Sequence, residues 1–62
     1  MTVRDVLMGL NFKYCHCVIK RKENMEIIPL GGGSVDNVIN RFGDLDIKES
    51  VIVDNILIFF VV

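Results

Sequence analysis

Apolar residues recur along this chain with two different periods, and each period predicts a different element. In residues 2–10 and 34–43 they fall at i, i+3, i+4 and i+7, which is one face of an amphipathic helix. Thr2 and Ser34 stand where N-caps belong, with Asp5 completing a capping box after Thr2. Gly43 stands where a left-handed helix stop belongs. Two short helices are therefore predicted.

Four further segments, residues 13–21, 25–30, 48–53 and 56–62, are rich in β-branched and apolar residues and predict strands. Residues 22–24 and 54–55 supply the turns between them, and Gly31 to Gly33 end the second strand. Pro29 cannot donate a backbone hydrogen bond, so this strand is expected at a sheet edge. The prediction is one α+β domain, residues 1–62, in the order αββαββ. Both helices lie on one face of a four-stranded antiparallel sheet.

The last segment, residues 56–62, is apolar at every position. A strand covered on one face alternates apolar and polar residues, so a strand apolar on both faces needs cover on both. A chain of 62 residues is near the small end of what folds alone. We therefore expect a second copy of the chain, or another protein, to supply the missing cover.

The two halves of the chain resemble each other. A shift of 32 residues places Thr2, Val3 and Val6 on Ser34, Val35 and Val38. Any two capped amphipathic helices match this well, so the order of elements is a firmer prediction than an internal duplication.

Composition and charge exclude several classes of protein. The chain is 52% hydrophobic with a net charge of −1, which argues against disorder and against a field that attracts nucleic acid or anionic membrane. Arg4 and Asp5 do not fit a signal peptide, and seven apolar residues fall short of the roughly 20 that span a bilayer. Cys15 and Cys17 are too close for a useful disulfide. A cytoplasmic protein is expected, with no membrane partner and with nucleic acid an unfavoured one.

Gly31, Gly32, Gly33 and Ser34 lie between a predicted strand and a helix start, where backbone N–H groups can hold an anion. They lack both the lysine of a Walker loop and the G-x-G-x-x-G spacing. A flexible connector with a helix cap is the favoured explanation. They nevertheless define an alternative function, a nucleotide or phosphate binder with a cleft between two copies.

The residues suited to catalysis or metal binding do not form a site. On a strand His16 points away from Cys15 and Cys17, and a tetrahedral zinc site needs a fourth ligand that the chain lacks. We therefore expect no metal and no cofactor, with both cysteines in the core. No nucleophile–base pair can be assembled, which predicts a protein that is not an enzyme.

A basic cluster at a hairpin tip suggests a third function, oligonucleotide binding, although two nearby glutamates dilute its charge. The cluster consists of Lys13, Lys20, Arg21 and Lys22. Solvated turn charge that protects a sheet edge is the competing explanation.

The leading prediction is a non-catalytic interaction module that forms a homodimer or larger oligomer and binds another protein. Tyr14, His16 and Val18 are expected on the outer sheet face. Ile58, Phe59 and Phe60 are expected at the dimer seam, because aromatic anchors concentrate association energy.

Two short motifs resemble small accessory proteins encoded by phages and mobile elements of low-GC bacteria. They are the opening Thr2-Val3-Arg4-Asp5-Val6-Leu7 and the hairpin Val51-Ile52-Val53-Asp54-Asn55-Ile56-Leu57. The resemblance implies an accessory protein, some of which inhibit host defence systems by binding. It transfers no functional residue to this chain.

Overall fold

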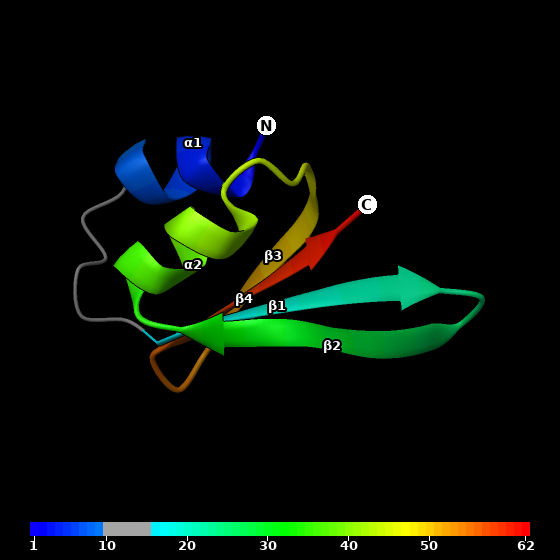
Figure 1. The fold of residues 1–62 in the computed structure, drawn as a ribbon. Helices are drawn as coiled ribbons and strands as arrows, with labels where there is room; N and C mark the ends of the chain where they lie inside the picture. Colours follow the sequence, from blue (N-terminus) through cyan, green and yellow to red (C-terminus); the bar gives the residue numbers. More distant parts are fainter. Residues whose placement is uncertain (10–15) are drawn as a thin grey trace.

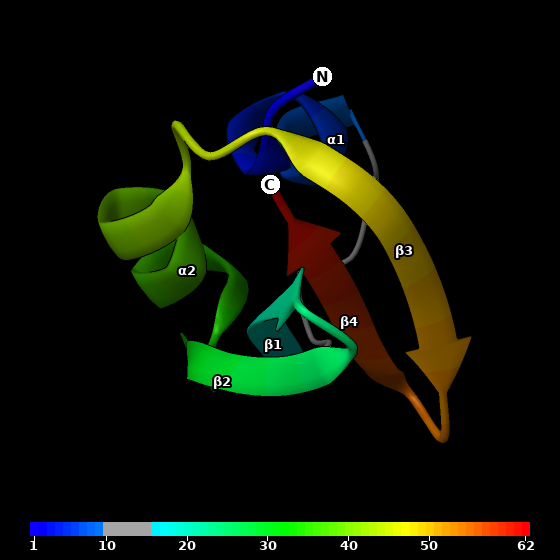
Figure 2. The same cartoon turned by 90° about the vertical axis from the view of Figure 1, so that its right-hand side faces the viewer.

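The structure is a computed structural model and describes residues 1–9 and 16–62 (Figure 1). Its elements are α1 (Val3–Gly9), β1 (His16–Glu23), β2 (Glu26–Gly33), α2 (Val35–Phe42), β3 (Ile47–Val53) and β4 (Ile56–Val61). Both helices lie on one face of a twisted four-stranded sheet (Figures 1 and 2). The predicted α+β class and the order αββαββ are confirmed.

The sheet is mixed, so the prediction of a wholly antiparallel sheet is wrong. Its strand order is β2-β1-β4-β3, with two antiparallel hairpins whose inner strands, β1 and β4, run parallel. The connection through α2 leads from β2, at one edge of the sheet, to the second hairpin. In that hairpin β4 is the inner strand, next to β1, and β3 forms the other edge. Side chains alternate between the two faces of a strand whether its neighbour runs parallel or antiparallel. The sequence pattern therefore could not reveal that β1 and β4 are parallel.

The two hairpins use the same kind of turn but take different places in the sheet. Asn24, Met25, Asp54 and Asn55 all have positive φ, between 49° and 66°, as two-residue type I′ turns require. The first turn is therefore Asn24-Met25 and not residues 22–24 as predicted. β1 is central while its counterpart β3 is at an edge, so the halves are not structurally equivalent.

The outer position of β2 follows from its composition. Pro29 lies on this edge strand, as predicted. The predicted strand end at Gly31 is wrong, because all three glycines continue the ladder, with Gly31 opposite Ile19 and Gly33 opposite Cys17.

The predicted helix N-caps are confirmed, and α2 ends at Gly43 as predicted, but the left-handed conformation predicted for Gly43 is wrong. Thr2 N–H donates to Asp5 Oδ2 (3.1 Å), and Asp5 N–H donates to Thr2 Oγ1 (3.2 Å). Asn37 N–H donates to Ser34 Oγ (3.3 Å). Gly43 stays in the right-handed region at φ −58° and donates its N–H to Ile39 O (3.0 Å).

Gly43 lies where the end of α2 meets the start of α1, and a side chain there would press on both. A Cβ would clash with Ile39 O of α2 and lie 3.1 Å from Arg4 Nη2 of α1, while the Gly43 carbonyl accepts the N–H of Arg4 at 2.9 Å. Leu45 O accepts the N–H of Val3 (3.0 Å), and Arg4 pairs with Asp44 at 2.9 Å. The start of α1 thereby uses the carbonyls of the loop after α2 to satisfy its free N–H groups.

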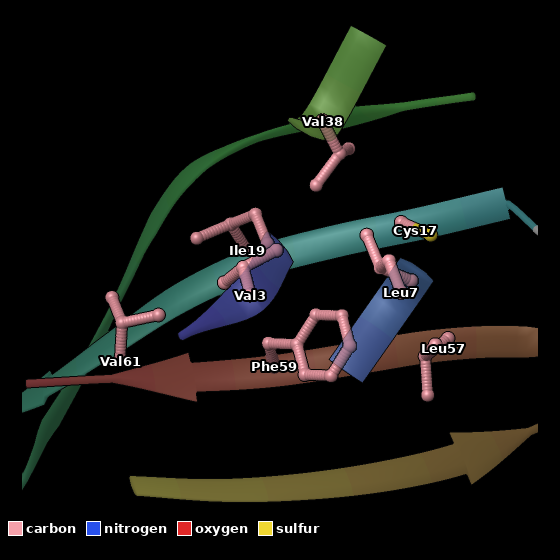
Figure 3. Packing of buried hydrophobic residues seen from close by; sticks show 8 residues of the cluster. All are labelled: Val3, Leu7, Cys17, Ile19, Val38, Leu57, Phe59 and Val61. Carbon is pink, nitrogen blue, oxygen red and sulfur yellow. The ribbon is translucent and has the colours of Figure 1, made fainter. Parts of the chain in front are cut away.

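The core lies between the helices and the inner strands (Figure 3). Its buried residues are Val3 and Leu7 of α1, Val38 of α2, Cys17 and Ile19 of β1, and Leu57, Phe59 and Val61 of β4. Phe59 is the largest of the fully buried side chains. Its predicted place at a dimer seam is therefore wrong, because alternation turns it toward the helices and turns Ile58 and Phe60 away.

We predict different costs for truncating the two adjacent phenylalanines. Phe59→Ala should lower the free energy of unfolding by about 3–5 kcal/mol, because it leaves a cavity in the core. Phe60→Ala should cost distinctly less, since this side chain lies on the other, half-exposed face. Urea unfolding followed by circular dichroism measures both, and equal losses would contradict the assigned faces.

We also predict that the capping box stabilises the fold in a pH-dependent way. The N–H of Thr2, followed by its hydroxyl, lowers the pKa of Asp5 below its ordinary value of 3.8. The folded state therefore holds this proton less tightly than the unfolded chain does. The resulting stabilisation is present above pH 3.8 and is lost as the pH falls through the lower, folded-state pKa. Asp5→Asn should be less stable than the wild type at neutral pH and differ least in acid. A difference independent of pH would contradict this.

Candidate functional site: the open face of the sheet

The face of the sheet opposite the helices is built by alternation within its strands. Because Leu57 and Phe59 point into the core, Ile58 and Phe60 point the other way. Strand register places residues of the neighbouring strands beside them, and we name this surface the open face. It comprises Ile27, Pro29 and Gly32 of β2, His16, Val18 and Lys20 of β1, Ile56, Ile58 and Phe60 of β4, and Glu49, Val51 and Val53 of β3.

No helix in the described part of the chain covers the open face (Figures 1 and 2). Val18, Ile58 and Phe60 are half-buried on this face. Val51 and Val53 remain 37% and 49% exposed. Exposed apolar centres of this kind are a common feature of interaction surfaces, so we take the open face as the candidate site.

A charged pair crosses one end of the open face. Lys22 Nζ lies 3.0 Å from Glu49 Oε2 and 4.6 Å from the centroid of the Phe60 ring. The pair bridges β1 and β3 above β4 and screens Phe60, with a cation–π contribution from the ammonium group. Both charges are about half exposed, so the ion pair itself adds little stability. The apolar centre is thus formed by Val18, Ile58 and Val51.

The structure brings together four of the six predicted interface residues, namely His16, Val18, Ile58 and Phe60. Tyr14 lies outside the described residues, and Phe59 is on the opposite face. Sequence reasoning missed Val51 and Val53. The predicted Asp54-Asn55 turn was the signal that could have found them, because a two-residue turn pairs Val53 with Ile56 and Val51 with Ile58.

The predicted anion loop is a packed strand. Gly31 to Gly33 pair with β1, and the Ser34 hydroxyl already caps α2. A Cβ on Gly32 would lie 2.6 Å from Cys17 O, and one on Gly31 would lie 2.8 Å from Phe42 Cζ. Close packing against β1 and α2 therefore explains these glycines, and the geometry does not favour the nucleotide-binding alternative.

The predicted separation of the cysteine and histidine side chains agrees with the described residues. Cys17 is buried in the core, whereas His16 is exposed on the open face. Cys15 and Lys13 lie outside the described residues. Within residues 1–9 and 16–62, no group of three or more His, Cys, Asp or Glu side chains could hold a metal ion.

The basic cluster is divided between the two faces of the sheet. Lys20 belongs to the open face, Lys22 is paired with Glu49, and Arg21 alternates to the helix side. A hollow of about 430 Å³ beyond the end of β4 is lined by Arg21, Lys22, Glu23, Lys48, Val61 and Val62. This lining mixes both signs of charge with two valines, so it does not form a continuous basic track for a phosphate backbone.

Comparison with known proteins identifies no relative: no family model, curated protein or solved structure matches this chain. Over residues 1–9 and 16–62, none of the helices has the length and apolar character needed to cross a membrane. The functional argument therefore rests on the geometry of the open face.

A matched pair of glycine substitutions tests whether packing explains the glycine segment. Gly32→Ala should destabilise the fold by about 1–3 kcal/mol, because its methyl group would press on the backbone of β1. Gly9→Ala, a helical position with open space around its Cβ, should be neutral or stabilising by up to about 1 kcal/mol. Thermal and urea unfolding measure both. If Gly32→Ala leaves the free energy of unfolding unchanged, close packing does not explain the glycines, and the interpretation of this segment as a loop is favoured again.

Proposed function

We propose that this chain is a non-catalytic protein–protein interaction module that acts as a homo-oligomer and binds another protein through its open face. The observation that carries the proposal is the unequal cover of the sheet. Both helices pack on one face, while the other presents an apolar centre of Val18, Ile58 and Val51. A sheet face of this character is stabilised when a second layer covers it.

The size of the molecule supports a surface-binding role. A standard protein interface buries about 800 Å² on each partner, roughly a fifth of the 4336 Å² accessible surface of this chain. The twelve residues of the open face span all four strands and would form the central part of such a contact. Their polar members His16, Lys20 and Glu49, together with Lys22, which pairs with Glu49, suit the rim of an interface.

The proposed mechanism is steric. The module occupies a surface that its partner needs for another contact, as an inhibitor or accessory protein encoded by a mobile element would do in the cytoplasm. Chemistry is not required of it: the imidazole of His16 lies on the open face, and Ser34 is used as the cap of α2. The open face supplies contact area without a nucleophile and base in register.

Charge placed in the centre of the open face should abolish partner binding without unfolding the protein. We expect Ile58→Lys to lose at least tenfold in affinity for the partner, because a buried unpaired ammonium at the centre of an interface costs more than about 1.4 kcal/mol. Met8→Lys is the matched control, since Met8 is 74% exposed on α1, on the other side of the sheet.

The measurement is affinity capture from the native host with the three proteins, followed by titration of the purified partner. A partner retained by the wild type and by Met8→Lys but lost by Ile58→Lys supports the proposal. Equal retention by all three folded proteins, with circular dichroism as the check on folding, would remove the open face from the function.

A further inference from the structure

The two edge strands of the sheet, β2 and β3, differ in how well they are protected from pairing with a strand of another chain. On β2, Pro29 removes a donor, and the register shifts where Leu30 is the extra residue. Both features are devices that keep an edge strand from pairing with another chain. Within residues 1–9 and 16–62, such devices protect only the first half of the edge formed by β3.

The first half of the β3 edge is occupied by the start of the chain. Met1 O accepts the N–H of Ile47 at 2.9 Å, and Thr2 forms a bridge with Asp46. A register shift between Ile47 and Glu49 adds local irregularity. Pairing with the N-terminal residues and this bulge therefore protect the edge up to residue 49.

The second half of the edge, residues 50–53, has three apolar residues after Ser50, and these are exposed on both sides of the sheet. Val51 and Val53, on the open face, are 37% and 49% exposed, and Ile52, on the helix side, is 59% exposed. A strand added alongside would cover all three. An uncovered edge segment of this composition is the usual template for strand addition.

The register of the hairpin determines which backbone groups face outward. Val53 and Ile56 flank a two-residue turn, and in such hairpins this closing pair exchanges its hydrogen bonds. The pattern alternates along the strand. The N–H and C=O groups of Ser50 and Ile52 therefore point to the free edge and are available to another strand.

We propose that two copies of this chain pair through these edges, with β3 antiparallel to β3 of the partner and Val51 on the two-fold axis. This register sets Ser50 opposite Ile52 of the partner subunit, so that every outward-facing group of residues 50–53 gains a strand partner. It also brings Lys48, at the bulge, near Asp54 of the partner subunit, in the turn, so that opposite charges meet just beyond each end of the new ladder.

Neighbouring registers leave more of the outward-facing backbone N–H and C=O groups without a hydrogen-bond partner. A slip of one residue sets outward-facing positions against inward-facing ones and breaks the ladder. With the axis at Ile52, Ser50 lies opposite Asp54 of the partner subunit, which is in the turn. With the axis at Ser50, Lys48 lies opposite Ile52 of the partner subunit. Only the axis at Val51 satisfies both outward-facing residues within the strand and pairs the charges at its ends.

The edge pairing deepens the proposed function and rests on its homo-oligomeric part. The two-fold axis is perpendicular to the sheet, so the open faces of both copies lie on the same side. They join into one surface over twice the four strands of a single chain. Oligomerisation then enlarges the surface offered to a different protein instead of covering it.

The test uses the full 62-residue chain and sedimentation equilibrium over a range of concentrations. The wild type should form a dimer of twice 7.0 kDa. Ile52→Lys should raise the dimer dissociation constant by about tenfold or more, since it places two like charges near the axis. Ile28→Lys is the matched control, because Ile28 is 36% exposed on the helix side of the opposite edge strand, and it should leave the constant nearly unchanged.

A charge reversal tests the register. Lys48→Glu should weaken the dimer because it faces Asp54 of the partner subunit, and adding Asp54→Lys should recover much of the loss. Circular dichroism confirms that each variant is folded. Insensitivity of the dimer to the reversal would overturn the proposed register.

Two other outcomes separate this inference from the proposed function. A dimer that survives Ile52→Lys but dissociates in Ile58→Lys overturns the edge pairing and assigns the contact between copies to the open face. A wild type that stays monomeric at every concentration overturns the edge pairing as well, while partner capture with Ile58→Lys still decides the role of the open face.

Discussion

The parallel pairing of β1 with β4 is the contact on which the rest of this structure depends. It brings Cys17 and Ile19 beside Leu57 and Phe59, and these side chains form the floor on which both helices pack. It also joins the two hairpins into one sheet, because neither hairpin contacts the other through its outer strand. A single hairpin with one short helix would bury too little apolar surface to be stable alone.

Close backbone approach holds the helical layer on this floor. Gly32 lets β2 approach β1, Gly31 makes room for Phe42, and Gly43 lets the start of α1 reach the end of α2. The N–H groups of Val3 and Arg4 find carbonyls in the loop after α2, so α1 is positioned by hydrogen bonds as well as by burial. With both helices used on one face, the described chain has no further layer for the other.

This imbalance connects the fold to the proposed function. The open face has an apolar centre and a polar rim, and the Lys22–Glu49 pair screens Phe60 at one end. The unguarded half of β3 lies beside it, so two copies joined there would present one continuous face. Face and edge thus have separate roles in the proposal: the edge joins copies, and the face binds the other protein.

Local patterns carried much of the information on this fold. The spacing of Val35, Val38, Ile39 and Phe42 identified a helix, Ser34 its cap, and Asp54-Asn55 a tight turn. These features depend on interactions within a few residues, so they can be inferred without knowing the neighbours in space. The placement of His16 and Val18 on the face away from the core likewise follows from period-two alternation.

Only the tertiary structure decided how the segments meet. A strand that is apolar at every position has no alternation to orient it, so nothing in residues 56–61 said that Phe59 faces the core and Phe60 does not. The extension of β2 through Gly31 to Gly33 depends on the close approach of β1 and Phe42. The parallel β1–β4 pair depends on the crossover through α2. The sequence by itself determined the elements and their caps. The three-dimensional packing determined strand order, strand direction and which apolar face stays open, because those choices depend on contacts between residues far apart in the chain.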